Sequence, residues 1–393
     1  MKTNSSKNKD AFSDPSIKVP FFIPEISKED KDSVSKALDA PLLTDGPKLR
    51  EFESLFAKFA GAKYAVGISN ATSALHLSLK AAGIVKGDEV IIPDLTFVAT
   101  ANAVLLCGAT PVLADIDEDL NISVKSIKKN LTSRTKAILP VHMAGKATKI
   151  QAIAKIARAN DLVLIEDCAH AIGARIGSRH VGTFGDAGCF SFYPTKNITT
   201  IEGGMVITNS KEIAKYIMTA RSHGITRTLS QRYATGKPWD YDVIEPGYNY
   251  RLDEIRSALG ISQLKRIKNL NLARKRACEY YNSRLAGIKG VVTSEIAQKN
   301  DNVYHLYIIK IQKKYGLSRD QVFKKLLESG IRTSVHYKPL HEFTAYKKMG
   351  KVFGPLTNVK RIYREIISLP LYPQITKHEQ DLVIRCIADN HLR

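Results

Sequence analysis

Short apolar runs alternate with amphipathic helical stretches over the first half of the chain. Apolar runs bounded by Gly, Pro, Asp or Asn predict seven strands. They are Tyr64–Ile68, Glu89–Ile92, Pro111–Ala114, Ala137–Val141, Leu162–Glu166, Cys189–Phe192 and Met205–Thr208. Helical spacing between them predicts helices over Ser73–Ala82, Val98–Leu106, Ile150–Ala159 and Lys211–Thr219. Strands that alternate with helices usually pair in parallel, so the pattern predicts an α/β fold with a mostly parallel sheet covered on both faces.

The pattern changes beyond Tyr248. A long helical stretch from Leu252 through Leu285 precedes a predicted strand at Tyr304–Ile311, a helix that begins near Ser318 and a final helix near Lys377–Ala388. Because 393 residues exceed what one core usually supports, we expect two domains of unequal size. We predict a disordered N-terminal tail over residues 1–18, a large α/β domain over 19–250, and a linking helix with a smaller α+β domain over 251–393.

Composition narrows the class of protein. The chain is 44% hydrophobic and 25% charged, which is typical of globular proteins. No apolar run approaches the roughly 18 residues of a membrane span, and the polar N-terminus lacks the apolar core of a secretory signal. The five cysteines are odd in number and form no C-x-x-C pair, which argues against a disulfide framework or a thiolate metal site. We therefore expect a cytoplasmic protein with no membrane partner and no metal.

The formal charge of +21 has three possible explanations: solvated helix faces, steering of a phosphorylated substrate, or nucleic-acid binding. Basic residues are spread along the sequence, with modest clusters at Lys265–Lys268 and Arg274–Arg276 and acids among them. No basic tail or aromatic-basic repeat is present. Nucleic acid is therefore the least favoured explanation.

Loops that follow the strands carry the candidate chemistry, because ligands gather at the carboxyl ends of parallel strands. The loop Ser69–Leu75 places small hydroxyl residues at a helix start, which suits a phosphate, although Thr72 or Ser73 would serve any protein as a helix N-cap. Phe97 follows the next strand and offers a flat face to a planar ring, or is ordinary core.

Asp167 ends a fully apolar strand, where a carboxylate needs a cation or several donors. A protonated ring nitrogen would serve, and so would a helix cap or a structural ion pair. His170 either supports that carboxylate or is a satisfied core histidine. Lys196 lies between a proline turn and Gly203-Gly204, where a fixed amine can capture a carbonyl as a Schiff base, although most lysines here must be surface residues.

In chain order these loops offer a phosphate cradle, an aromatic face, an acid and a lysine, which is what pyridoxal phosphate requires. The motifs that carry the pattern are Leu43–Pro47, Asn70–Leu75, Thr96–Ala103, Glu166–Ala171, Phe190–Gly204, Gly247–Arg251 and Ser368–Leu371. They resemble the DegT/StrS family of nucleotide-sugar aminotransferases, which are pyridoxal-phosphate enzymes of the aspartate-aminotransferase fold (fold type I).

The resemblance implies a role for each matching residue. Lys196 would be the catalytic Schiff-base lysine and proton shuttle, and Asp167 the catalytic partner of the pyridine nitrogen. The other implied cofactor contacts are Ala71, Thr72, Phe97, His170, Ser191 and, from the partner subunit of a homodimer, Asn249. Arg227, His336 and Tyr337 are candidates for substrate binding.

The implied reaction moves an amino group from L-glutamate to a nucleotide-linked keto-sugar, with pyridoxamine 5′-phosphate as the intermediate form of the cofactor. Lysine at position 196 argues against the branch of the family that has histidine there and dehydrates sugars. The segments Arg221–Arg227 and Ile331–Tyr337 look most like members that aminate C4 of UDP-linked 4-keto-sugars for surface glycoconjugates. Amination at C3, a fold-type-I lyase or desulfurase acting on free amino acids, and a regulatory or nucleic-acid-binding protein remain alternatives.

Overall fold

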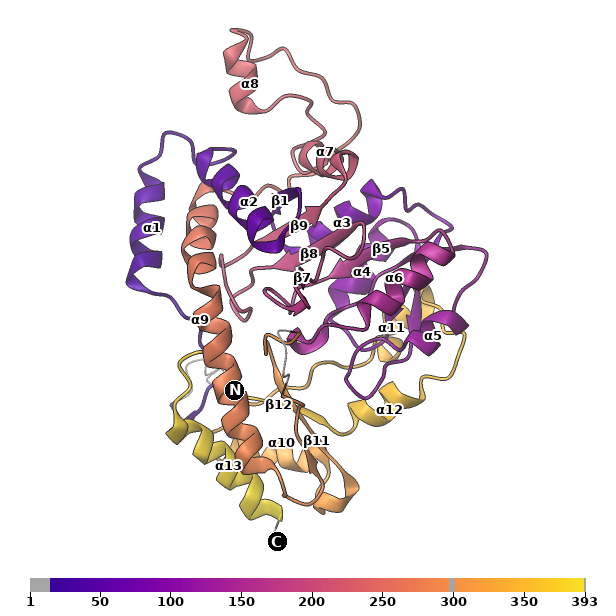
Figure 1. Cartoon of the computed structure of the whole chain (residues 1–393), viewed down its shortest axis with the longest axis vertical. Helices are drawn as coiled ribbons and strands as arrows, with labels where there is room; N and C mark the ends of the chain where they lie inside the picture. The colour runs from indigo at the N-terminus through magenta and orange to yellow at the C-terminus, as the bar shows by residue number, and fades with distance from the viewer. Residues whose placement is uncertain (1–14, 297–300, 392–393) are drawn as a thin grey trace, which may run out of the picture.

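The computed structural model describes residues 15–296 and 301–391 (Figure 1). All seven predicted strands form, and they make one sheet in the order β1-β9-β8-β5-β4-β2-β3. Their bounds are β1 (Tyr64–Ile68), β2 (Glu89–Pro93), β3 (Thr110–Ala114), β4 (Thr135–Ile138), β5 (Val163–Asp167), β8 (Ala187–Ser191) and β9 (Gly204–Thr208). Only β9 runs antiparallel to its neighbours β1 and β8 within this sheet. The predicted mostly parallel α/β sheet is confirmed.

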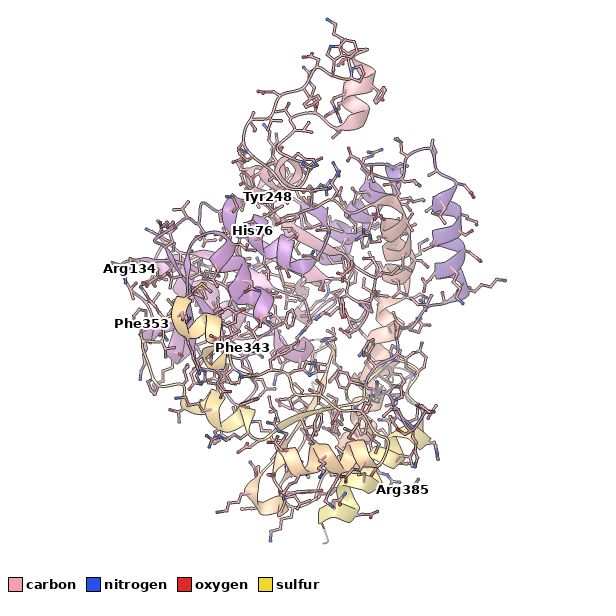
Figure 2. All side chains as sticks on the ribbon, turned by 180° about the vertical axis from the view of Figure 1, so that it is seen from behind. His76, Arg134, Tyr248, Phe343, Phe353 and Arg385 are labelled. Atoms are coloured by element: carbon pink, nitrogen blue, oxygen red, sulfur yellow. The ribbon has the colours of Figure 1, made fainter. Side chains whose placement is uncertain are left out.

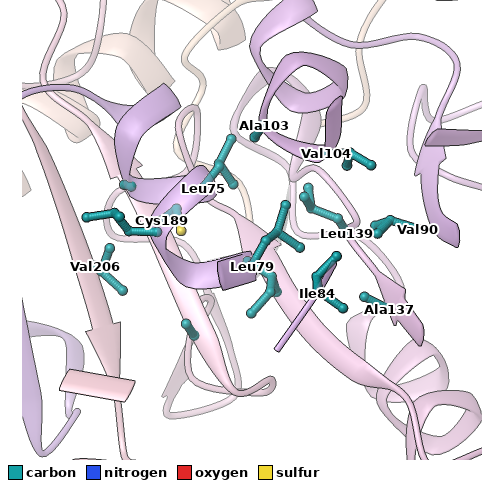
Figure 3. Close-up of a cluster of buried hydrophobic side chains, with 14 of the residues drawn as sticks. Leu75, Leu79, Ile84, Val90, Ala103, Val104, Ala137, Leu139, Cys189 and Val206 are labelled. Carbon is teal, nitrogen blue, oxygen red and sulfur yellow. The ribbon is translucent and has the colours of Figure 1, made fainter. Parts of the chain in front are cut away.

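Helices cover both faces of the sheet, which explains why its strands read as nearly continuous apolar runs. One face carries α3 (Ala71–Ala81), α4 (Val98–Leu106) and α7 (Lys211–Ala220), and their side chains share a core with the strands (Figure 3). The other face carries α2 (Pro47–Ala60), α5 (Val124–Lys129), α6 (Ile150–Ala159) and α9 (Glu254–Leu285). α1 (Lys28–Leu38) packs on the outside of α9. Among the described residues, no helix combines the length and the apolarity that a membrane crossing needs.

A smaller lobe follows α9. It contains a three-stranded antiparallel sheet of β10 (Val291–Val292), β11 (Tyr307–Ile311) and β12 (Ile366–Leu369), covered by α10 (Arg319–Glu328) and α13 (Lys377–His391). The predicted start of α10 is confirmed, because Ser318 and Gln321 form a capping box. The predicted strand at Tyr304 begins three residues late, at Tyr307.

The smaller lobe also takes residues from outside the predicted C-terminal domain. Val19 pairs with Ile331 and is buried in the core of this lobe. In the other direction, α11 (Thr344–Met349) and α12 (Thr357–Tyr363) return to the large sheet, where the N–H of Lys351 donates to Pro111. The predicted domain boundaries stay a prediction. The large domain was predicted to begin at residue 19, whereas Val19 belongs to the smaller lobe. Residues 1–14 of the predicted tail lie outside the described residues.

Two hairpin-like segments complete the large domain. β6 (Arg175–Ile176) and β7 (Arg179–His180) pair with each other between β5 and β8. Residues 221–250 leave the sheet after α7 as a projecting segment that carries α8 (Leu229–Ala234) and extends away from the body of the molecule (Figure 1).

The core beneath α3 and α4 should tolerate loss of volume poorly. Leu79 is fully buried there (Figure 3), so we expect Leu79→Ala to destabilise the fold by about 2–5 kcal/mol and to lower the urea midpoint. Val85→Ala is the matched control, because Val85 is 58% exposed and should change the midpoint little. An equal midpoint for both variants would contradict this description of the core.

Candidate active site

Lys196 lies in a closed loop between β8 and β9. The N–H of Lys196 donates to the carbonyl of Tyr193 at 2.9 Å, and the N–H of Thr200 donates to Phe192 at 2.9 Å. A Cβ on Gly203 would lie 2.1 Å from the Oγ1 of Thr200, so this turn has no room for a side chain there. The predicted combination of turn and glycine pair therefore forms a compact structure that holds the lysine at the end of β8.

The environment of Lys196 makes its amine easier to deprotonate than an ordinary lysine. Burial lowers the pKa of Lys196 to about 8 because an ammonium is poorly solvated there, while the charge of Asp167 acts in the opposite direction. Phe21, His305, His336 and Tyr337 line a small cavity together with the lysine. The interpretation of Lys196 as an ordinary surface lysine is therefore wrong.

Asp167 ends β5 and is 4% exposed. Its carboxylate accepts hydrogen bonds from the Oγ1 of Thr100 at 3.0 Å and from the N–H of Ala169 at 3.1 Å. Burial raises the pKa of Asp167 despite these donors. Across the described residues no Lys, Arg or His side chain forms an ion pair with it. The structural ion pair that the sequence left open is therefore not found, and a cationic ring nitrogen would supply the missing partner.

Glu166, the neighbouring carboxylate, has a different task. It accepts from the N–H groups of Gly182, Phe184 and Gly185 at 2.7–2.9 Å and contacts the Nε2 of His142 at 3.0 Å. The Nδ1 of His142 accepts from Thr148, so its Nε2 carries the proton and donates to Glu166. This buried network fixes the loop that follows β7.

The same network contains the one group of potential metal ligands found among the described residues, His142, Glu166 and Cys168. The hydrogen bonds to Glu166 occupy its oxygens, and burial raises the pKa of Cys168 well above its ordinary value. A thiol is a poor ligand until it loses its proton. The geometry therefore fits a hydrogen-bonded support better than a metal centre.

The start of α3 lies beside the end of β8. Asn70, and not Thr72 or Ser73, is the N-cap: its side chain accepts from the N–H of Ser73 at 2.9 Å. The hydroxyl of Thr72 is consequently not used as the cap, and the N–H groups of Ala71 and Thr72 lie at the free end of an 11-residue helix. The sequence alone does not identify Asn70 as the N-cap, because Asn, Ser and Thr are all good caps and only the backbone conformation selects one of them.

Ser191 is brought to this helix start by the sheet. Ser191 pairs with Gly204 across β8 and β9, and a Cβ on Gly204 would lie 2.6 Å from the carbonyl carbon of Asn70. Glycine at 204 therefore allows the strand to touch the first turn of α3. Ala71, Thr72 and Ser191 are therefore on neighbouring elements, and their role as a phosphate cradle stays a prediction.

Phe97 is 54% exposed at the N-cap of α4, so the alternative of an ordinary core residue is wrong. Its ring lies 5.8 Å from the ring of Tyr337. The hydroxyl of Tyr337 contacts the Nε2 of His170 at 3.2 Å, and the Nδ1 of His170 accepts from the N–H of Ala144. His170 is buried and its pKa is lowered by burial, so it is a neutral ring that lies within the site.

Several residues of the site were not selected from the sequence. Thr100 contacts Asp167, and the ring of His305 lies 4.4 Å from the ring of His170. Phe21 stacks on His336, whose Nδ1 lies 2.8 Å from the Oγ of Ser368. Thr100 could have been predicted from the sequence. It lies three residues after Phe97, nearly one helical turn, and therefore on the same side of the helix. Phe21 and His305 carry no local signal, since neither follows the carboxyl end of a predicted strand.

Arg227 and Asn249 do not join this cluster within one chain. Arg227 lies on the projecting segment and pairs with Asp240 at 3.2 Å. Asn249 is exposed, although its neighbour Tyr248 packs edge-on against His76 of α3 with ring centroids 5.1 Å apart (Figure 2). The segment is thus anchored on α3, while Asn249 remains exposed to solvent.

Comparison with known proteins gives a consistent picture. Residues 24–388 match the model of the DegT/DnrJ/EryC1/StrS aminotransferase family. The chain is 39% identical to the spore coat polysaccharide biosynthesis protein SpsC of Bacillus subtilis, over 94% of this chain and 96% of that protein.

Two solved structures are similar to the whole fold. PseC of Helicobacter pylori, an aminotransferase of pseudoaminic acid biosynthesis, superposes with a TM-score of 0.89 at 32% identity, over 95% of this chain and 99% of that one. The putative sugar aminotransferase Spr1654 of Streptococcus pneumoniae in its PMP form gives a TM-score of 0.89 at 28% identity, with coverages of 95% and 99%.

The lowered pKa of Lys196 can be measured in cofactor-free protein. Only a neutral amine reacts with acetic anhydride, so acetylation of Lys196 should rise with pH through a midpoint near 8. In Asp167→Asn the midpoint should fall, because the carboxylate charge that favours the ammonium is gone. Mass spectrometry of the Lys196 peptide gives both curves. A midpoint near 10.5, the ordinary value of lysine, would contradict the buried environment.

Proposed function

This chain belongs to the DegT/DnrJ/EryC1/StrS aminotransferase family, and we propose that it moves an amino group from L-glutamate to a nucleotide-linked keto-sugar. The acceptor that we favour is C4 of a UDP-linked 4-keto-6-deoxy sugar or 4-keto-pentose, for a cell-surface polysaccharide or glycoconjugate. The main support is the pair formed by Lys196 and Asp167, a half-buried amine in the loop after β8 and a buried carboxylate at the end of the adjacent strand β5, whose charges interact. We place the enzyme in the cytoplasm.

The site residues fit pyridoxal 5′-phosphate. Ala71, Thr72 and Ser191 would hold the phosphate at the start of α3, and Phe97 would lie against the ring. Asp167 would accept a hydrogen bond from the ring nitrogen, which adds to the two donors that its carboxylate has among the described residues. Bound there, the cofactor supplies an electron sink beside the carbon that carries the amino group.

Lys196 and Asp167 would then each hold or transfer a proton. Lys196, with a pKa of about 8, can take a proton at Nζ from the α-carbon of the amino donor and return it later. Asp167 would keep the ring nitrogen of the bound cofactor protonated. Tyr337 lines the cavity that contains Lys196, and the neutral ring of His170 contacts the Tyr337 hydroxyl, so this pair can orient a bound group without adding charge.

The relatives support a role in the biosynthesis of a surface polysaccharide or glycoconjugate. PseC and SpsC are named for pseudoaminic acid and spore coat polysaccharide, respectively. We assign His336 and Tyr337 to the sugar side of the cavity and Arg227 to the diphosphate.

Because Arg227 and Asn249 lie outside the site of their own chain, we propose a homodimer in which they act on the neighbouring site. The side chains of Phe97, Tyr193 and Ile201 are exposed beside the site. A partner subunit would cover them, which supports the homodimer.

The attachment of the cofactor to Lys196 is directly testable. We expect the purified protein to absorb in the visible and borohydride to fix the cofactor on the peptide that contains Lys196. Lys196→Ala should lose both the fixed cofactor and turnover, whereas Lys211→Ala, at an exposed helix start, should keep both. Asp167→Asn should bind cofactor but lose roughly 10²- to 10⁴-fold in turnover. Fixation on another lysine would contradict the assignment.

The acceptor can be identified by incubating the holoenzyme and glutamate with UDP- and dTDP-linked 3-keto- and 4-keto-sugars. We expect amino-sugar formation, read by mass spectrometry, chiefly from a UDP-linked 4-keto-sugar. Product from 3-keto-sugars alone would replace C4 by C3. Release of sulfide or aldehyde from free amino acids, with no amino sugar, would favour a lyase or desulfurase.

A further inference from the structure

A second groove lies apart from the cavity that contains Lys196. It has a volume of about 850 Å³ and lies between the end of α2, the middle of α9 and the loops around Gly173 and Val303. Its floor is apolar, with Phe59, Ile261 and Leu264 among the lining residues. This volume lies in the range of small-molecule sites, which are mostly apolar with a few polar groups.

The groove is strongly basic. Its lining residues include Lys58, Arg175, Lys265, Lys268 and Lys275, and none of them is acidic. Arg175 donates to the carbonyls of Ser178 and Phe59, and Lys275 reaches Glu279 at 3.8 Å. The ammonium groups of Lys58, Lys265 and Lys268 have no ion-pair partner within residues 15–296 and 301–391. Clustered like charges repel one another, so this groove is more stable with an anion inside it.

The spacing of the lysines favours two adjacent anionic groups. Lys265 and Lys268 are three residues apart on α9 and therefore lie on one face, displaced by about 4.5 Å along the helix axis. Lys58 adds a third cation from α2, and the apolar floor lies beside them. A single inorganic phosphate would leave that floor uncovered. We propose that the groove binds a nucleoside diphosphate, with the lysines on the diphosphate and the planar base against the apolar floor.

One side chain joins this groove to the catalytic loop. Asn271 lines the groove, and its Oδ1 accepts a hydrogen bond from the Nδ2 of Asn197 at 2.7 Å. Asn197 directly follows Lys196 and also donates to the carbonyl of Val303, a second lining residue. A Cβ on Gly173 would lie 2.8 Å from the Nδ2 of Asn271, so the amide has little freedom. A ligand that displaces Asn271 or Val303 therefore changes the support of Lys196, which makes the groove a regulatory site beyond the proposed transamination.

Calorimetric titration of the holoenzyme with UDP tests the site. Lys265→Glu/Lys268→Glu should bind one UDP fewer per chain than the native protein, or bind that UDP at least tenfold more weakly. Lys128→Glu/Lys129→Glu is the matched control, because these exposed lysines at the end of α5 give the same change in net charge and should leave binding unaltered. The comparison holds whether or not UDP also binds at the catalytic site, so it is independent of the proposed function.

Three results would overturn the assignment. Equal UDP binding by the native protein and the groove variant would remove the site. If the control variant lost as much UDP binding as the groove variant, binding would depend on the overall charge of the protein and not on this groove. The native protein could instead bind a helical peptide of Glu and Leu and not UDP. If the groove variant lost that peptide binding, the ligand would be a protein partner and not a nucleotide.

The link to Lys196 has its own test. In the native holoenzyme, UDP at saturation should shift the pH midpoint of the visible cofactor absorption. Asn271→Ala keeps the lysines, so it should bind UDP within about threefold of the native affinity but show no such shift. A shift that persists in Asn271→Ala, or one absent from the native protein, would contradict the coupling.

Discussion

Desolvation of two opposite charges is the constraint on which the rest of this site depends. Asp167 and Lys196 sit at the ends of the adjacent parallel strands β5 and β8, where helices on both faces exclude water. Burial raises the pKa of the acid and lowers the pKa of the amine, and each charge partly offsets the shift of the other. The pKa of the amine is thereby brought closer to neutral pH while the charge of Asp167 still acts on it. A surface pair could not achieve this, because water would restore both ordinary pKa values.

Hydrogen bonds and close backbone contacts keep that arrangement rigid. Glu166 holds the loop after β7 through three backbone N–H groups, while Gly204 lets β9 touch the start of α3. The polar side chains of the site are therefore supported by elements that have almost no freedom to adapt. Such pre-organisation is what proton transfer at a fixed distance needs.

The cavity wall is assembled from distant parts of the sequence. Phe21 enters from the N-terminal segment, Lys196 from the large sheet, and His305 and Tyr337 from the smaller lobe. Any change in the angle between the lobes would alter this cavity. The basic groove at α9 lies on the helix that joins the lobes, with Asn271 hydrogen-bonded to the residue beside Lys196. Asn271 of α9 and the loop that carries Lys196 are in this way parts of one hydrogen-bonded unit.

Local sequence determined the seven strands of the large sheet, the helices α3, α4, α6, α7, α9, α10 and α13, and the order of the main site residues, but it did not indicate α1, α2 or the short strands β6, β7 and β10. Apolar runs ending in Asp167 or in the turn before Lys196 carry their own signal, because strand and turn formation depend on neighbouring residues. The resemblance of the motifs to one family added roles that spacing alone could not assign.

Tertiary structure decided what depends on contacts between remote segments. It selected Asn70 as the cap, left Phe97 exposed, brought His305 to His170 and placed Val19 in the smaller lobe. It also showed that Arg227 and Asn249 lie outside the site of their own chain, and that scattered lysines line one groove beside Asn271. The physical reason is that burial and desolvation arise from the packing of the whole chain, and no local pattern of residues encodes them.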